Sequence, residues 1–317
     1  MEDLATGLKP TTMETKRFII EDKLLPYFSS MKIRNIDELA VRRWQNKLLD
    51  YRNEKGTPYS DTYLKTINNQ LSAIMNYAMV YYKLAKNPCR AVGSIGKANA
   101  DAMQIWTLDQ FEQFLGYEKK AAGRLAFNIL FWSGIREGEL LALTRNDFIC
   151  GGVDEYRLNI NKNYEVVRGT AYILTPKADS SIRCITIPLF LYYEAIQYFE
   201  ALYEPDPDER LFYFTKSYLL NEIKRVAQAA GLPPIRIHDL RHSHASLLIE
   251  MGFNILMVSQ RLGHEKVETT WQTYAHLYPD KEKILAAQLD TVKVRGITAN
   301  VTIEDQLTEF MSQFQNR

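Results

Sequence analysis

The sequence has few cysteines and lacks long apolar runs. Its three cysteines, Cys89, Cys150 and Cys184, are widely spaced along 317 residues. They match neither zinc-ligand spacing nor a disulfide framework, so reduced thiols in the cytosol are expected. No segment approaches the roughly 18 consecutive apolar residues of a membrane span, and the N-terminus lacks the basic and apolar regions of a secretory signal. These absences favour a cytoplasmic protein with no membrane partner.

Neither sign of charge prevails in the whole chain, which has 39 Lys and Arg and 38 Asp and Glu. The net charge of +1 therefore neither indicates nor excludes a nucleic-acid partner. The distribution is uneven, because residues 1–100 hold 16 Lys and Arg against 10 Asp and Glu. A basic first third is typical of a domain that contacts phosphates, although helices that only need solvation explain it equally well.

The first third of the chain has the apolar periodicity of helices. Thr11 and Glu14 match a capping box, which predicts a helix that begins there and ends near Pro26. Ser60 is the expected N-cap of a long helix. Further along, Thr107 is the expected N-cap of a helix that opens the second part of the chain.

Composition divides the chain into four parts. Residues 1–90 are expected to form a helical domain, and the small, Gly-containing residues 91–104 an interdomain linker. Residues 105–279 are expected to form an α+β domain, and residues 280–317 a short amphipathic helix with a polar tail. A small antiparallel sheet in the second domain is predicted from alternating segments at 153–160, 166–174 and 182–187.

An arginine stands in a Gly-flanked turn before a predicted helix, in the segment SGIREGEL. Arg136 can fork onto phosphate oxygens there, while the adjacent glycines would let a DNA backbone approach closely. Glu139 would hold the following turn or orient Arg136. Taken alone, this pattern is more typical of a surface arginine at a helix start.

Two further segments carry groups suited to phosphate chemistry. Lys177 lies in a turn between predicted strands, where a lysine is usually solvated but can also deliver a proton into a DNA groove. His238 and Arg241 are three residues apart on one helix face and could contact one phosphate together. His238 and His242 also have the four-residue spacing of zinc helices, but Asp239 replaces the required glutamate.

Tyr274 follows His264 by ten residues. The chain has 19 tyrosines, so a single one is a weak candidate nucleophile. A phenol with a pKa near 10 also needs help to attack phosphate at neutral pH. The case for Tyr274 therefore depends on its position after the other motifs. Capping or packing is the plain interpretation of His242 and His244.

Together these segments resemble the tyrosine recombinase (phage integrase) family. The resemblance covers about residues 104–290 and rests on the ordered motifs SGIREGELLAL, TPKADSSIRCITIP, HDLRHSHAS, RLGH and TYAHL. The family pattern is an arginine followed closely by Gly-Glu, a β-turn lysine, His-x-x-Arg, a His or Trp, and a tyrosine about ten residues later. Every element is present in order.

The first ninety residues are similar to the helical core-binding (SAM-like) domain of integrases from phages and conjugative transposons. The fold that the resemblance implies is mainly α with a small antiparallel β-sheet, in which this domain precedes an α+β catalytic domain. Many such integrases carry a further arm-binding domain that has no counterpart in this sequence. A shortened chain and a naturally shorter enzyme are the two alternatives.

The resemblance implies chemistry of the type IB topoisomerase kind. Tyr274 would attack the scissile phosphate, form a 3′-phosphotyrosyl bond and release a 5′-hydroxyl. Arg136 and Arg241 would hold the non-bridging oxygens as negative charge develops. No ATP, metal or other cofactor would be needed, because the covalent bond keeps the energy of the phosphodiester.

The remaining family positions imply roles in proton transfer and phosphate binding. Lys177 would protonate the leaving 5′-oxygen, and His238 would assist proton transfer around Tyr274. His264 would donate a hydrogen bond to the phosphate. Glu139 would support the turn that carries Arg136.

Duplex DNA attachment sites are the partners that the resemblance implies. Four copies would assemble on two synapsed sites, with accessory proteins that bend DNA or promote excision. The helix over 280–289 would dock on a neighbouring subunit or else fold back on its own domain. Possible DNA contacts in the basic first domain are Arg34, Arg42, Arg43, Lys47 and Lys65.

Two rival functions follow from the same residues. A DNA-binding protein that only occupies or synapses sites would have no need of all six candidate catalytic side chains. A metal-dependent hydrolase would use the histidine cluster and bind zinc stoichiometrically.

Overall fold

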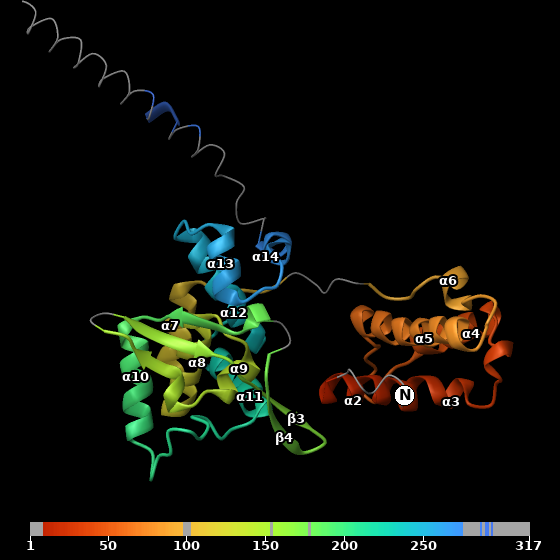
Figure 1. The fold of residues 1–317 in the computed structure, drawn as a ribbon, viewed down its shortest axis with the longest axis horizontal. Coiled ribbons are helices and arrows are strands. Elements are labelled where there is room, and N and C mark those ends of the chain that lie inside the picture. Colours follow the sequence, from red (N-terminus) through yellow and green to blue (C-terminus); the bar gives the residue numbers. More distant parts are fainter. Residues whose placement is uncertain are drawn as a thin grey trace, which may run out of the picture. The chain divides into compact units, whose positions relative to one another are not determined.

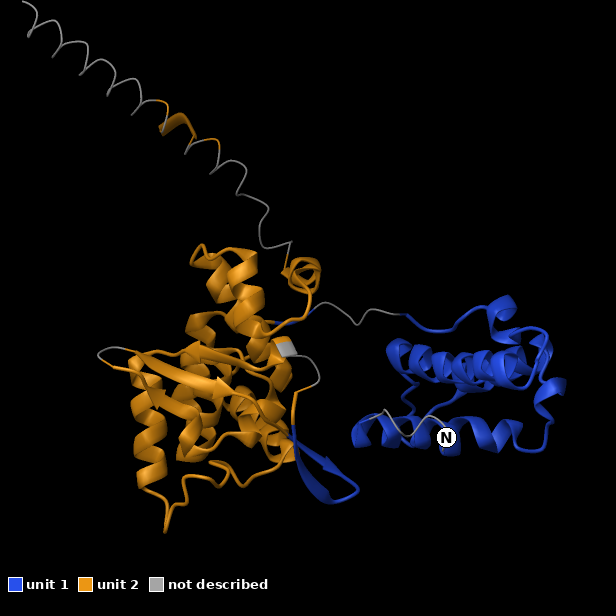
Figure 2. Ribbon diagram, in the orientation of Figure 1, with its two compact units in different colours: residues 1–104, 164–174 blue, residues 105–163, 175–317 orange. Residues whose placement is uncertain are grey.

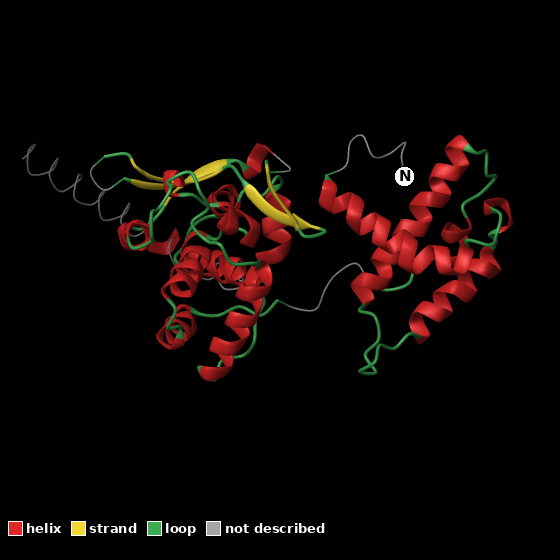
Figure 3. Cartoon of the chain, turned by 90° about the horizontal axis from the view of Figure 1, so that it is seen from below, coloured by secondary structure: helices red, strands yellow, loops and turns green. Residues whose placement is uncertain are grey.

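The computed structural model describes residues 9–97, 103–152, 155–176, 179–274, 286, 289–291 and 293. The chain forms two compact units, shown in different colours in Figure 2. Unit 1 comprises residues 1–104 and 164–174, and unit 2 comprises residues 105–163 and 175–317. The predicted fold class, mainly α with small antiparallel sheets, is confirmed (Figure 3).

Unit 1 is helical apart from the short segment 164–174. In chain order its helices are α2 (Pro10–Ile19), the π-helix η1 (Ile20–Leu24), α3 (Leu25–Phe28), the 3₁₀-helix η2 (Ile33–Asn35), α4 (Glu38–Asp50), α5 (Asp61–Tyr81) and α6 (Pro88–Val92), of which Figure 1 labels the α-helices. The predicted cap of α5 is confirmed, because the Ser60 side chain accepts a hydrogen bond from the backbone N–H of Tyr63.

The predicted limits of the first helix are wrong at both ends. Its N-cap is Lys9, and Thr11 lies inside the helix, where its carbonyl accepts a hydrogen bond from the Thr15 hydroxyl. The helical path also continues through Pro26 to Phe28. A π-helical turn causes this, because α3 starts anew after it and Pro26 falls in a first turn, where no intrahelical N–H is required.

The core of unit 1 is formed by α4 and α5 together with the first helical segments, from Ile19 to Phe28, and the segment after α5. Trp44 on α4 is 1% exposed and packs against Phe28 of α3. Gln45 is fully buried, and its amide nitrogen donates to Asn68 Oδ1 (2.9 Å) and to the carbonyl of Gly93 (2.8 Å). These bonds satisfy a buried polar group and join three segments of the unit.

Unit 2 contains the remaining helices and a three-stranded sheet. Its elements are α7 (Leu108–Tyr117), α8 (Ala121–Ser133), α9 (Glu137–Ala142), the 3₁₀-helix η3 (Arg145–Asp147), β1 (Phe148–Cys150), β2 (Tyr156–Ile160), the 3₁₀-helix η4 (Asp179–Ser181), β5 (Arg183–Thr186), α10 (Leu189–Glu200), α11 (Lys216–Ala229), α12 (Ile237–Glu250), α13 (Ile255–Leu262) and α14 (Val267–Tyr274). The predicted cap at Thr107 is confirmed as a capping box with Gln110.

The strands form two antiparallel sheets where one was predicted. The first has the order β1-β2-β5, with Leu158 opposite Ile185 in the register of β2 and β5. The segment predicted as one strand over 166–174 is part of a hairpin of β3 (Asn163–Val167) and β4 (Thr170–Leu174). Arg168 and Gly169, both with positive φ (50° and 79°), make the two-residue turn that the alternating pattern concealed.

Helix α8 lies at the centre of unit 2. Helix α12 packs against it, and α10 packs against both α8 and the strands β1 and β2. The phenyl rings of Phe111 and Phe131 stack with centroids 3.9 Å apart in this core. Along the described part of the chain, no helix is long and apolar enough to cross a membrane.

Candidate active site

Arg136 lies between α8 and α9, and its position depends on the preceding glycine. Gly134 ends α8 in the left-handed conformation (φ 67°), and a Cβ atom there would lie 2.5 Å from the His244 ring. The sequence suggested that the glycines allow a DNA backbone to approach. In the structure, the group that requires a glycine at position 134 is instead a protein side chain, that of His244. Close packing against α12 fixes the turn that presents Arg136.

Glu139 holds Arg136 from two sides. Its Oε2 accepts the Arg136 backbone N–H (2.8 Å), and its Oε1 accepts Nη1 of the same residue (2.8 Å). Arg136 Nη2 also donates to the carbonyl of Gly263 (3.2 Å). Burial works to raise the pKa of Glu139, but hydrogen bonds and charge from Arg183 and Arg136 outweigh it and lower that pKa. The carboxylate is thus ionised and opposes two guanidinium charges.

Arg241 reaches the same region from α12. Its side chain is 2% exposed, and it donates to the carbonyls of Gly134 (2.8 Å) and Leu262 (2.7 Å). Burial and the nearby Arg136 charge lower the pKa of this guanidinium, which nevertheless remains cationic at neutral pH. Two arginines from separate segments therefore place positive charge at one site.

His264 is half-buried and His238 is exposed, and the pKa of each is lowered. His264 follows α13, and its Nδ1 is 2.7 Å from the Thr270 hydroxyl on α14. Burial, with the charges of Arg241 and Arg136, lowers the pKa of His264 to about 4. Burial and the same two arginines also lower the pKa of His238. The shared electrostatic partners show that His238, Arg241, Arg136 and His264 are gathered together.

Tyr274 ends α14 and is 1% exposed. Its hydroxyl is 2.6 Å from Nδ1 of His242. Burial raises the pKa of the Tyr274 phenol, while the Arg241 charge opposes the shift. Five of the six sequence-derived candidates, Arg136, His238, Arg241, His264 and Tyr274, thus lie in one electrostatic neighbourhood.

The family model described as "Phage integrase family" matches residues 104–281 of this chain. The chain belongs to the phage integrase family. A second model, "Phage integrase, N-terminal SAM-like domain", matches residues 1–49 and so extends the assignment to unit 1.

Relatives of this integrase are found among mobile elements. It is 29% identical over 299 residues to the ICEBs1 integrase of Bacillus subtilis, an alignment that covers 89% of this chain and 78% of that relative. It is 28% identical over 293 residues to the putative prophage phiRv2 integrase of Mycobacterium tuberculosis, with 89% and 74% covered. The integrase is an enzyme of the tyrosine recombinase type, which carries out site-specific DNA recombination.

The fold of the integrase is also similar to solved structures. The Tn1549 transposon integrase in complex with a circular intermediate DNA has a TM-score of 0.69 and 22% identity, with 89% of this chain and 95% of that chain covered. A lambda integrase dimer bound to a core site has a TM-score of 0.62 and 17% identity, with 85% and 73% covered. At these identities the likeness concerns the fold.

The remaining candidate residues of the integrase lie either outside the described residues or in unit 1. Lys177 and residues 280–285 lie outside the described residues. Of the candidate DNA contacts in unit 1, Arg42 donates to the Val92 carbonyl (2.9 Å), and the Lys47 ammonium lies over the Tyr27 ring. Arg34 and Arg43 are exposed, and Lys65 is half-buried.

Two side chains that the sequence did not single out for chemistry are part of the site. His242, interpreted from the sequence as a capping or packing residue, is bonded to Tyr274. Arg183 on β5 donates to both carboxylate oxygens of Glu139 (3.2 and 3.0 Å) and to the carbonyl of Arg261 (2.9 Å). The only signal for Arg183 in the sequence is its place in the segment TPKADSSIRCITIP, after the turn that carries Lys177.

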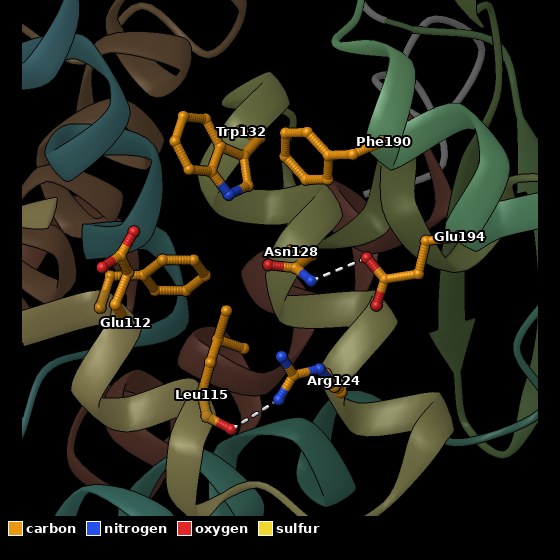
Figure 4. Close-up of a pocket in the computed structure, with 8 residues that line it drawn as sticks. Glu112, Leu115, Arg124, Asn128, Trp132, Phe190 and Glu194 are labelled. Atoms are coloured by element: carbon orange, nitrogen blue, oxygen red, sulfur yellow. Dashed lines mark hydrogen bonds between the residues drawn. The ribbon is translucent and has the colours of Figure 1, made fainter.

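A separate surface pocket of about 520 Å³ lies over α7, α8 and α10. Figure 4 shows Trp132 and Phe190 on one side of it and a hydrogen bond from the Asn128 amide to Glu194 (2.8 Å) across it. Its lining shares no residue with the candidate catalytic set. Among the described residues, no group of three or more His, Cys, Asp or Glu side chains is arranged to hold a metal ion.

Proposed function

We propose that this integrase cleaves and rejoins duplex DNA through a 3′-phosphotyrosyl bond to Tyr274, and so integrates and excises a mobile element. The observation that carries the proposal is the meeting of Arg136, Arg241 and the Tyr274 hydroxyl in one site, with Arg241 close enough to oppose the raised pKa of that phenol. Two guanidinium groups beside a nucleophilic oxygen suit attack on a phosphodiester.

The reaction divides into attack and departure. The Tyr274 oxygen bonds to phosphorus as the bond from phosphorus to the 5′-oxygen breaks, and Lys177 supplies the proton that the 5′-oxygen takes. Arg136 and Arg241 stabilise the charge that develops on the non-bridging oxygens. Both guanidinium groups already donate hydrogen bonds to backbone carbonyls, and that of Arg136 also donates to Glu139. Their positions are therefore fixed before DNA binds, which preorganises them for the phosphate.

The histidines and the glutamate complete the proposed assignment. His264 hydrogen-bonds the phosphate, and His238 assists proton transfer around Tyr274. Glu139 acts through Arg136, which it holds at the backbone and the guanidinium. Rejoining reverses cleavage. A 5′-hydroxyl attacks the phosphorus of the phosphotyrosyl bond, and the Tyr274 oxygen is released.

DNA binding is assigned to both domains. Residues 1–90 form the core-binding domain, residues 91–104 the linker, residues 105–279 the catalytic domain, and residues 280–317 the C-terminal helix and tail. Four copies act on two synapsed attachment sites, with accessory proteins that bend DNA or favour excision, in the bacterial cytoplasm where the DNA lies. The exposed residues Arg34 and Arg43 suit phosphate contacts better than Arg42, whose guanidinium is held by Val92.

A nicked attachment-site duplex tests the proposal, because loss of the short fragment beyond the nick traps the covalent complex. Wild-type protein is expected to give a DNA adduct that survives denaturing electrophoresis, and Tyr274→Phe none. An adduct in Tyr274→Phe overturns the assigned nucleophile. Site binding by wild-type protein without any adduct would favour the non-catalytic binding and synapsis protein instead.

A further inference from the structure

The Tyr274 hydroxyl has a specific hydrogen-bond partner in the described structure. The distance from Tyr274 Oη to His242 Nδ1 is 2.6 Å, and the two ring centroids are 5.7 Å apart with a 55° angle between the planes. This imidazole nitrogen therefore contacts the atom that would attack phosphorus. A 2.6 Å separation is at the short end of hydrogen-bond distances.

The packing around the phenol fixes this contact. Tyr274 packs in an apolar cluster with Ala245 and Ile249 of α12 and with Val258 and Leu262 of α13. His242 precedes Ala245 by three residues and Ile249 by seven, so all three lie on one face of α12. The same helix face thus supports the ring and presents Nδ1 to its hydroxyl.

A second hydrogen bond holds the same face of α14. Thr270 and Tyr274 are four residues apart, and their hydroxyls are hydrogen-bonded to Nδ1 of His264 and of His242, respectively. They are also the two buried residues of this helix. The two hydrogen bonds hold both turns of α14 in place. They therefore restrain the phenol of Tyr274 from rotating away from His242.

The protonation states of the two partners fit a bond from the phenol to the imidazole. Burial lowers the pKa of His242 to about 4, helped by His238, Arg241 and Arg236. Burial raises the pKa of Tyr274. At neutral pH both groups are uncharged, and in the tautomer that carries the imidazole proton on Nε2 the phenol O–H donates to Nδ1.

We propose that His242 is a further catalytic residue, which accepts the proton of the Tyr274 hydroxyl during attack on the phosphate. The proposal rests on the proposed role of Tyr274 as nucleophile. The proton moves from Oη to Nδ1, the Oη–phosphorus bond forms, and the bond from phosphorus to the 5′-oxygen breaks as Lys177 protonates the leaving group. On rejoining, His242 returns its proton to the departing phenol oxygen.

Charge from the DNA favours this transfer. Part of the lowered pKa of His242 comes from the cationic groups Arg241 and Arg236. A phosphodiester held by Arg241 brings negative charge to the same site and offsets that contribution. His238, one turn earlier on α12, meets the His242 ring edge-on at 4.9 Å and lies beside the proton acceptor.

Two substitutions of His242 separate proton transfer from hydrogen bonding. His242→Asn places an acceptor oxygen where Nδ1 lies, on the same Cγ atom, but cannot hold the proton. His242→Ala removes the ring and leaves space for free imidazole. The measurement is the single-turnover rate of adduct formation on the nicked duplex, with and without added imidazole, at protein concentrations that saturate DNA in a mobility-shift assay.

We expect both variants to form the adduct at least about 10²-fold more slowly than wild type, the usual loss when a proton-transfer group is removed. Imidazole should accelerate His242→Ala and leave His242→Asn unchanged. Glu250→Gln, an exposed substitution at the far end of α12, is the matched control and should cleave at the wild-type rate.

Wild-type rates in His242→Asn would overturn the proposal, because a hydrogen-bond acceptor would then suffice. Failure of imidazole to accelerate His242→Ala, with His242→Asn folded and bound to DNA but slow, would also overturn it and reduce His242 to a positioning role. These outcomes differ from failure of the proposed function, in which wild-type protein forms no adduct or Tyr274→Phe still forms one.

Discussion

Arg183 and Glu139 form a buried ion pair in which Nη2 and Oε2 are 3.0 Å apart. The two side chains are 7% and 2% exposed, and they come from β5 and from the first turn of α9. The same carboxylate holds the Arg136 guanidinium. Arg183 therefore acts through Glu139 on Arg136, the arginine proposed to hold the phosphate, and is a positioning residue that does not itself need to touch DNA.

Loss of the Glu139 charge should destabilise unit 2 and slow cleavage. Glu139→Gln leaves the buried Arg183 guanidinium without a counter-charge, and such a loss costs about 3–5 kcal/mol of unfolding free energy. Urea unfolding measures the change. Disruption of the exposed Arg17–Glu21 pair by Arg17→Ala is the comparison, with an expected cost below about 1 kcal/mol. Equal losses in the two variants would contradict the role of burial.

The conservative change Arg183→Lys should separate stability from catalysis. It keeps a positive charge near Glu139 but loses the planar fork that binds both carboxylate oxygens. We expect a smaller stability loss than in Glu139→Gln, together with slower adduct formation because Arg136 is less well held. An adduct rate equal to wild type would show that Glu139 alone positions Arg136.

Gly134→Ala should be more harmful than a glycine substitution with the same backbone conformation. Both Gly134 and Gly231 have positive φ (67° and 68°), but a Cβ atom at Gly134 would lie 2.5 Å from His244, whereas at Gly231 nothing lies within 4 Å. Gly231→Ala is thus expected to lose only the roughly 1–2 kcal/mol of left-handed strain. Thermal unfolding of both variants tests whether Gly134→Ala loses clearly more.

Acid should destabilise unit 2 through its buried histidines. His244 is 2% exposed, and burial, with Arg261 and Arg241, lowers its pKa to about 3. The unfolded chain therefore binds this proton below about pH 6.5 while the folded chain does not, so stability falls with falling pH by up to about 1.4 kcal/mol per pH unit. His244→Gln keeps an acceptor for Arg261 and should remove this part of the slope between pH 6 and 4, measured by urea unfolding.

Deletion of residues 280–317 should impair assembly while it spares the active site. Ile284, Leu285 and Leu289 form an apolar stripe in the sequence, and Leu289 is 61% exposed. Such a stripe favours docking on a neighbouring subunit. We expect loss of synapsis in a two-site assay, with adduct formation on single sites retained. Unchanged recombination after the deletion would contradict this role.

Local signals in the sequence were sufficient for much of the fold. The caps at Ser60 and Thr107 were predictable because each involves backbone groups only three residues away. The hairpin turn at Arg168 and Gly169 was not predicted because β-branched and apolar residues flank it on both sides, as they would in one continuous strand. The π-turn was not predicted because the helical spacing of apolar residues does not reveal one.

The candidate site was likewise predictable only in part. Arg136, His238, Arg241, His264 and Tyr274 were found from their order and spacing. His242 and Arg183 owe their importance to partners 32 and 44 residues away, and such tertiary contacts leave no mark in spacing. A histidine beside a motif arginine looks the same in sequence whether it packs, caps or bonds a tyrosine.

The π-turn at Ile20–Leu24 has the geometry of a single residue inserted into an α-helix. Removal of one residue there would restore a regular α-helix, because the π-turn absorbs the extra residue without rotating the segments on either side of it. Phe28 would still face Trp44, whose ring lies 5.6 Å from it. A one-residue deletion within Pro10–Ile19 would instead rotate the preceding part of the helix by about 100° relative to the core. The π-turn thus keeps the phase of the buried side chains at the expense of regular hydrogen bonding, and a one-residue deletion should be better tolerated in this turn than within α2.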